Sequence, residues 1–575
     1  MSTRLGSRTK ADDKWSILAA TRLMAAPSAA PAARRRGGAP RRRRSARAVA
    51  AAGLHAVARH PWLITAVFAI AFGLLAPRTG DEAAAYFRAH LFQREGFALW
   101  DAQWFGGHNL PGYSILFPPL GAVLGVRMVG VLSSIAAAVL FERLLPERYG
   151  AGARVGAVAF AVGALANLAA GRVTFALGVA VGLAALVALR RGHPLCAAGL
   201  AAATALASPV AGLFLALAAV TAFAVYRRRE AAGVAAGALA PILAFAGLFP
   251  EVGSQPFAFS DLLVVGALAA AGLLLLPRSE RILGVGVLLY AAAAAAAFAI
   301  PTPLGGNVTR LGELFGLPLL ACALWRDRRA ALAVLALPLL AWQWAPGTDA
   351  VAVAAGDPSL HRDYYKPLVS FLDRAAHRGG PMRIEIPLTR DHWETVWVAR
   401  RLELARGWER QLDERYNGLF YAPSLTAAQY RAWLLDNAVS YVAVPDVPLD
   451  DAALAEARIV RGGSPFLRPV WHSRDWRVFA VAGARPLLEG PGRLVRLVPQ
   501  GFTLDAARAG DFTIRLRFTP YWSVADQAGC TMRAPGGWTR VHAFRPGRVS
   551  VGVRFRLALI GASSGQCQPT DRTAS

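Results

Sequence analysis

The chain has 575 residues, of which 55% are hydrophobic and only 17% are charged, and its mean hydropathy is +0.37. Because soluble proteins usually carry about a quarter charged residues, this profile excludes an ordinary soluble protein and indicates a polytopic membrane protein with soluble mass attached. A formal net charge of +27 would suggest nucleic acid as partner in a soluble chain. Many of the basic residues lie in an N-terminal tail or in short loops between apolar segments, so no nucleic-acid partner is expected.

Residues 1–49 are predicted to form a disordered cytoplasmic tail. They are rich in Ala, Pro, Gly and Arg, with an RRR run at 34–36 and an RRRR run at 41–44. The basic region is too long, and the apolar stretch after it too extended, for a cleaved signal peptide. A tail held near anionic lipid is the simpler interpretation.

Apolar segments of membrane-helix length recur from residue 50 to residue 345, and they predict a transmembrane domain with about 11 crossings. The fifth segment is short and directly abuts Ser208 and Pro209, which predicts a tight hairpin between the fifth and sixth. The segments lie near 61–77, 124–141, 154–170, 173–189, 195–207, 209–226, 231–248, 260–276, 282–300, 311–325 and 330–345.

The distribution of arginine predicts the orientation. If the N-terminus is cytoplasmic, the short outside turns carry only Arg172 and Arg310. The inside loops then hold Arg143, Arg148, Arg154, Arg190, Arg191, Arg227, Arg228, Arg229, Arg278, Arg281, Arg326, Arg328 and Arg329. The positive-inside rule favours this topology. An odd number of crossings then places the 80–121 loop and the C-terminal region on the external face of the cytoplasmic (plasma) membrane.

The region after residue 345 has ordinary soluble composition. We expect an external α/β domain at 346–485, with a helix at 427–436 and a buried strand at 439–444. After that the pattern alternates with period two, and it predicts a β-sandwich at 486–575 with a flexible C-terminal tail. The inward positions of two of its strands are Phe512, Ile514, Leu516 and Phe518, and Val549, Val551, Val553 and Phe555.

Two of the four cysteines, Cys530 and Cys567, lie in this last region. A disulfide between them is expected if the region is external, since disulfides persist in oxidising compartments. Their spacing alone leaves the pairing open.

The 80–121 loop is the candidate active site. Asp81 and Glu82 open it at the lipid–water boundary, where charges are costly and tend to be kept for function. Residues 83–92 then predict a short interfacial helix, and a turn-rich aromatic run follows. The plain alternative is that the two acidic residues only cap that helix and favour its dipole.

The loop resembles the first external loop of the GT-C superfamily of polytopic glycosyltransferases, in particular its actinobacterial members. The resemblance is carried by GDE at 80–82, YFRA at 86–89 and the run LW-x3-W-x-GGH-x-LPGYS-x2-FPPLG at 99–121. It implies an inverting transferase that moves sugar from a polyprenyl-phosphate donor to an envelope glycan or glycolipid. It further implies that Asp81, with or without Glu82, is the catalytic base or binds a divalent metal such as Mg²⁺ or Mn²⁺, and leaves open which.

Such a transfer needs a carboxylate to take the proton of the acceptor hydroxyl and cations for the departing phosphate. The donor-phosphate candidates are Arg88, His108, Arg172 and Arg310. The plain alternatives are interfacial anchors for Arg88 and Arg172, a hydrogen bond of His108 within its own loop, and a snorkelling Arg310 paired with Glu313. The sugar-contact candidates near the membrane are Trp100, Asp101, Trp104, Tyr113 and Glu313.

A second dense mixture of aromatic and hydrogen-bonding side chains lies in the α/β region. It suits a polyol, and we expect it to bind acceptor glycan if this region packs over the first loop. The alternative is a solvated helix with weak Arg–Glu pairs. Its members are His392, Glu394, Arg406, Trp408, Glu409, Gln411 and Asp413.

Two other classes of function remain open. A transporter or flippase of lipid-linked envelope material would show two related halves and polar residues near mid-membrane. A non-catalytic membrane scaffold that binds glycan would not need Asp81. The three hypotheses share the lipid bilayer as partner and differ in what a change at Asp81 does.

Overall fold

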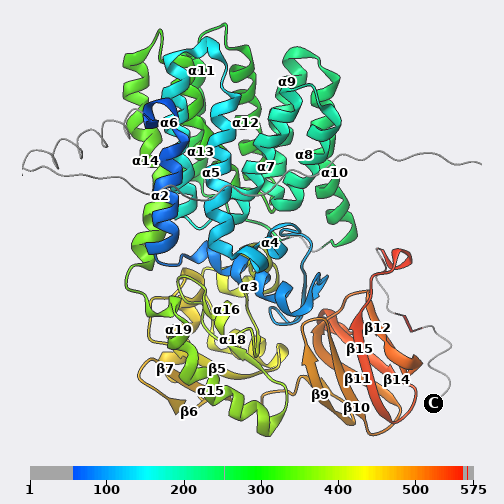
Figure 1. The fold of residues 1–575 in the computed structure, drawn as a ribbon. Coiled ribbons are helices and arrows are strands. Elements are labelled where there is room, and N and C mark those ends of the chain that lie inside the picture. The colour runs from blue at the N-terminus through cyan, green and yellow to red at the C-terminus, as the bar shows by residue number, and fades with distance from the viewer. Residues whose placement is uncertain (1–55, 251–252, 561, 563–565, 568–575) are drawn as a thin grey trace, which may run out of the picture. The chain divides into compact units, whose positions relative to one another are not determined.

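Apolar helices that lie side by side make up the first part of the described chain (Figure 1). The computed structural model describes residues 56–250, 253–560, 562 and 566–567, so the predicted 1–49 tail lies outside them. Each predicted apolar segment coincides with a helix. These are α2 (Trp62–Leu75), α5 (Val126–Leu144), α6 (Ala151–Ala169), α7 (Val173–Arg190), α8 (Pro194–Ala207), α9 (Pro209–Tyr226), α10 (Arg229–Leu248), α11 (Phe259–Leu275), α12 (Arg281–Ala299), α13 (Thr309–Leu324) and α14 (Arg329–Ala354).

Not every predicted apolar segment forms a helix that is long and apolar enough to cross a membrane by itself. Within the described ranges, six helices are long and apolar enough, or up to eight if each of two bent pairs forms one span. Two further apolar helices, α8 and α11, are shorter. The chain is therefore a polytopic helical membrane protein, while the count of about 11 and the orientation remain predictions.

The first bent pair positions the start of the loop. Helix α3 (Gly80–Glu95) turns by 76° from α2, and it contains the short helix predicted at 83–92. Arg127 on α5 stabilises the corner, because its guanidinium donates to the carbonyl oxygens of Ala76, at 2.7 Å, and Pro77. These are carbonyls at the end of α2, which lack partners within their own helix.

The α/β module, residues 357–485, contains a five-stranded mixed sheet. Its strand order is β4-β3-β5-β7-β6, with β3 parallel to β4 and β5 and the other neighbours antiparallel. The predicted helix and strand at 427–436 and 439–444 are both present. The strands are β3 (Arg383–Glu385), β4 (Glu403–Leu404), β5 (Val439–Pro445), β6 (Leu467–His472) and β7 (Trp476–Val481), and the helices are α15 (Arg362–Gly379), α16 (Glu394–Trp397), α17 (Arg410–Tyr416), α18 (Ala427–Asp436) and α19 (Leu454–Arg461).

The β-sandwich, residues 486–557, consists of two four-stranded sheets with orders β12-β15-β10-β9 and β13-β14-β11-β8. Phe512, Ile514 and Leu516 are fully buried, as their alternation predicts. Phe555 lies beyond the last strand and is 40% exposed, so its predicted inward position is wrong. The strands are β8 (Leu488–Glu489), β9 (Gly492–Val498), β10 (Gly501–Ala506), β11 (Gly510–Arg517), β12 (Trp522–Val524), β13 (Gly529–Arg533), β14 (Trp538–Ala543) and β15 (Gly547–Val553). A disulfide joins Cys530 to Cys567.

The loop after α3 is pinned to both modules. Its two short strands, β1 (Trp100–Asp101) and β2 (His108–Asn109), form an antiparallel pair. The loop donates a backbone hydrogen bond to the carbonyl of Pro499, at 2.9 Å, and accepts others from Leu404 and Arg517, each at 2.8 Å. Backbone groups of one segment therefore fix the α/β module and the β-sandwich at the same place.

Trp104 is the side chain on which this junction depends. It is fully buried, stacks on Phe87 of α3 at 4.0 Å between ring centroids, and donates from Nε1 to the Thr395 carbonyl at 3.1 Å. We predict that Trp104→Ala lowers the free energy of unfolding by about 3–5 kcal/mol, the usual cost of removing a buried large aromatic. Thermal unfolding of the detergent-purified chain measures it. Phe97→Ala, at a 68% exposed ring, is the control, and an equal loss in both variants would contradict the assignment.

Candidate active site

Asp81 faces two arginines from distant parts of the chain. Its Oδ2 atom lies 3.9 Å from Nε of Arg172 and 3.9 Å from Nη2 of Arg310. Asp81 is in the first turn of α3, Arg172 precedes α7, and Arg310 is in the first turn of α13. The Asp81 side chain is 40% exposed, so the carboxylate is open to a ligand while both cations stay beside it.

A close approach of two backbones brings Arg172 to Asp81. Gly171, in the turn between α6 and α7, has a φ of +76°, and a Cβ atom there would lie 2.3 Å from Oγ1 of Thr79 and 3.1 Å from the backbone nitrogen of Glu82. Only glycine allows this conformation and this distance together. The α6–α7 turn is therefore pressed against the N-terminus of α3, and the next residue, Arg172, reaches the acidic position.

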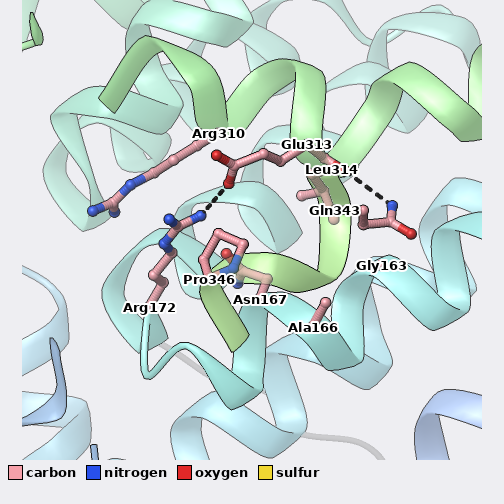
Figure 2. A pocket seen from close by; sticks show the side chains of 9 residues that line it. All are labelled: Gly163, Ala166, Asn167, Arg172, Arg310, Glu313, Leu314, Gln343 and Pro346. Atoms are coloured by element: carbon pink, nitrogen blue, oxygen red, sulfur yellow. Dashed lines mark hydrogen bonds and ion pairs between the residues drawn. The ribbon is translucent and has the colours of Figure 1, made fainter. Parts of the chain in front are cut away.

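A pocket opens beside these arginines (Figure 2). Glu313 forms an ion pair with Arg172, and Nε2 of Gln343 donates to the Glu313 carbonyl at 2.9 Å. Arg172 is thus held in place by a carboxylate, and Glu313 takes part as its partner rather than as a free sugar ligand. The pocket is lined by Gly163, Ala166, Asn167, Arg172, Arg310, Glu313, Leu314, Gln343 and Pro346.

Glu82 does not join Asp81 in this site. Its side chain is almost fully buried and lies 3.4 Å from Nε of Arg127. Glu82 therefore stabilises the corner between α2 and α3 through the same arginine that caps α2. The two adjacent carboxylates face different partners, because Glu82 pairs with Arg127 whereas Asp81 faces Arg172 and Arg310.

The predicted divalent metal does not fit these residues. Among the described residues, no group of three or more His, Cys, Asp or Glu side chains is arranged to hold a metal ion. Asp81 faces two guanidinium groups and Glu82 faces a third. This cationic setting favours an anion over a cation beside Asp81.

Arg88 is bound within the protein. It forms an ion pair with Glu409 of the α/β module, and its guanidinium carbon lies 3.9 Å from the Tyr113 ring centroid. Only 3% of the Arg88 side chain is exposed. The ion pair between Arg88 and Glu409 therefore links α3 to the module. Tyr113, half-buried, covers the arginine.

The other predicted ligands of the aromatic run are interior residues. Trp100, Asp101, Trp104 and His108 are all at most 2% exposed. His108 stacks on Trp104 with 5.7 Å between centroids. Burial raises the pKa of Asp101 to about 7 and lowers that of His108 to about 3. These side chains fill the junction between the modules and expose almost no surface to a sugar or phosphate.

Four members of the predicted acceptor cluster lie inside the α/β module. Arg406 donates to Asp413 at 2.6 Å and to Glu456 at 2.8 Å. Glu394 accepts from the Thr389 hydroxyl. The members Arg406, Asp413, His392 and Glu394 are at most 2% exposed. They form internal ion pairs and hydrogen bonds and expose almost no surface to an acceptor.

The module does pack over the first loop, as the acceptor hypothesis requires. Trp408 donates from Nε1 to the Gly80 carbonyl at 3.1 Å, and Nε2 of Gln411 donates to the Pro303 carbonyl at 3.3 Å. Asp391, next to His392 in the sequence, has its carboxyl group against the Gly80 backbone. The contacts of Trp408 and Asp391 with Gly80 join residues more than 300 positions apart. No local sequence pattern predicts them.

Among known proteins, this chain is similar only to solved structures, and both the structural similarity and the sequence identity are low. No family model matches the sequence, and no curated protein matches it. The crystal structure of apo ArnT from Cupriavidus metallidurans has a TM-score of 0.36 at 13% identity, covering 76% of this chain and all of that one. The apo oligosaccharyltransferase of Archaeoglobus fulgidus has a TM-score of 0.41 at 11% identity, covering 86% and 94%. Both scores lie below 0.5, so the functional proposal rests on the residues of this site.

The buried carboxyl groups of the α/β module predict how its stability depends on pH. Burial raises the pKa of Glu394 and of Glu403 to about 8 each. The folded state then holds protons that the unfolded chain releases near pH 4.5, so the contribution of these two groups to stability falls as pH rises from about 5 to about 8. Each group contributes at most about 1.4 kcal/mol per pH unit in this window.

Thermal unfolding between pH 5 and pH 9 tests this dependence. Glu403→Gln should flatten the decline, whereas the control Glu230→Gln, at an exposed position, should leave it unchanged. Stability that rises with pH across this range would contradict the assignment.

Proposed function

We propose that the chain is an inverting membrane glycosyltransferase of the GT-C type, with a polyprenyl-phosphate sugar as donor and an envelope glycan or glycolipid as acceptor on the external face. The observation that carries the proposal is the exposed Asp81 carboxylate with Arg172 and Arg310 each at 3.9 Å. Displacement of a phosphate from a sugar carbon needs a base for the acceptor proton and cations for the departing phosphate.

Each residue has one role in this reaction. Asp81 takes the proton of the acceptor hydroxyl as the hydroxyl oxygen forms a bond to the anomeric carbon. The bond from that carbon to the phosphate oxygen breaks, and the electron pair leaves with the polyprenyl phosphate. Arg172 and Arg310 stabilise the negative charge that develops on the departing phosphate.

The neighbouring carboxylates support a single displacement. A double displacement would need a second free carboxylate as nucleophile next to the first. Glu82 is paired with Arg127, and Glu313 is paired with Arg172. Asp81 is left as the base, and one base with one leaving phosphate favours inversion at the anomeric carbon.

Asp81 is the proposed base. Asp81→Asn should lower the rate of sugar transfer at least about 100-fold, since a positioned general base contributes about 10²–10⁴-fold. Purified protein is supplied with radiolabelled polyprenyl-phosphate sugars and envelope extract, with and without a chelator. Asp261→Asn is the matched control, because Asp261 also lies in the first turn of a helix but is exposed.

Transfer by Asp81→Asn at the wild-type rate would make Asp81 a helix cap, and no transfer by the wild-type protein from any donor would favour the scaffold and transporter hypotheses. The chelator should have no effect, because three guanidinium groups surround the acidic pair. Loss of transfer on chelation, restored by Mg²⁺ or Mn²⁺, would show that a metal acts here.

Arg310 is proposed to stabilise the leaving phosphate. Arg310→Gln should lower kcat/KM for the donor about 10-fold to 100-fold, in line with about 1.5–3 kcal/mol for a hydrogen bond to a charged group. Arg310→Lys should recover part of the loss because it keeps the charge. Arg281→Gln, at an exposed arginine of α12, is the control, and an equal effect there would remove Arg310 from the site.

A further inference from the structure

The α/β module holds the backbone of Gly80, the residue directly before Asp81, from both sides. Nε1 of Trp408 donates to the Gly80 carbonyl at 3.1 Å. The Gly80 backbone N–H is a hydrogen-bond partner of the Asp391 carboxyl group. A Cβ atom at position 80 would lie 3.2 Å from Oδ1 of Asp391 and 3.4 Å from its Cα. The donor and the acceptor of one peptide residue are thus both bound by the module.

Neighbouring residues hold Trp408, and the backbone next to Asp391, in place. The His392 ring stacks on Trp408 with 3.4 Å between centroids and 9° between planes. Nε2 of His392 lies 3.4 Å from Oδ2 of Asp450, which also binds Arg410 at 2.7 Å. His392 has a φ of +59°, a conformation that costs a non-glycine residue free energy and persists only where the surroundings impose it.

Asp391 is buried in this contact. It is 4% exposed, and its Oδ2 atom has no hydrogen-bond partner among the described residues. Burial, the largest cause, raises the pKa of Asp391 to about 7. A buried carboxyl group at the start of a helix satisfies one of the N–H groups that the helix itself leaves free.

We propose that Asp391 and Trp408 are positioning residues, which fix Gly80 and so set the orientation of Asp81 toward Arg172 and Arg310. The inference rests on the proposed function and adds that the α/β module is part of the transferase site. Because the first turn of a helix frays when its end groups lose their partners, release of Gly80 moves the Asp81 carboxylate. A displacement of about 1 Å at a reacting group can cost about 100-fold in rate.

The test combines kinetics with backbone hydrogen exchange on the full chain. Trp408→Phe removes the indole N–H and keeps a ring against His392. Asp391→Ala removes the acceptor, whereas Asp391→Asn keeps an acceptor oxygen. Matched controls are Trp471→Phe, at a tryptophan stacked on Phe371 in another part of the module, and Asp363→Ala, at an exposed acid of α15.

Trp408→Phe and Asp391→Ala should each lower kcat at least about 10-fold while KM for the donor stays within about 2-fold, because both phosphate-binding arginines remain. Asp391→Asn should restore most of kcat. Amides 80–83 should exchange faster in the first two variants and at the wild-type rate in Asp391→Asn and in both controls.

Wild-type kcat and wild-type exchange in Trp408→Phe and Asp391→Ala would overturn the inference. A rise in KM without a fall in kcat would also overturn it, since it would mean direct contact with donor. If the wild-type protein transfers no sugar, the proposed function fails, and the exchange of amides 80–83 alone then decides whether the module holds Gly80.

Discussion

Three parts of the chain contact the N-terminus of α3, and the geometry around Asp81 depends on these contacts. The α6–α7 turn presses against it at Gly171. Arg127 of α5 binds Glu82 and the end of α2 together. The α/β module closes the third side through Trp408. A helix start normally leaves several N–H groups without partners and frays easily. Here tertiary contacts replace those partners, so the acidic residue at this helix end has a defined direction.

The same constraint explains why the loop is rich in aromatic and charged residues. Sugar-binding sites and buried junctions between modules use the same side chains, since both need flat rings and hydrogen-bonding groups. Trp104 and His108 have the composition of a ligand site but fill the junction. Arg406 and Asp413 look like a polyol-binding pair and form an internal ion pair. Composition identifies the region that matters and does not separate its surface from its interior.

Patterns with a short period could be predicted, and contacts between distant residues could not. The helix at 427–436 and the alternation around Phe512 follow from local periodicity and are present. Charge asymmetry between loops singles out Arg172 and Arg310 as the arginines of the outside turns, and the structure brings both to Asp81. The division of Asp81 from Glu82, and the contact of Asp391 with Gly80, depend on packing across more than one module, so neither leaves a trace in the local sequence.

We propose that Asp81, Arg172 and Arg310 surround the phosphate of a lipid-linked sugar. An experimental structure of the full chain with a polyprenyl phosphate bound would test this arrangement. We expect the phosphate within hydrogen-bond distance of Arg172 and Arg310, with the Asp81 carboxylate next to the position of the sugar carbon. A phosphate bound beside Arg88, or away from all three residues, would contradict it.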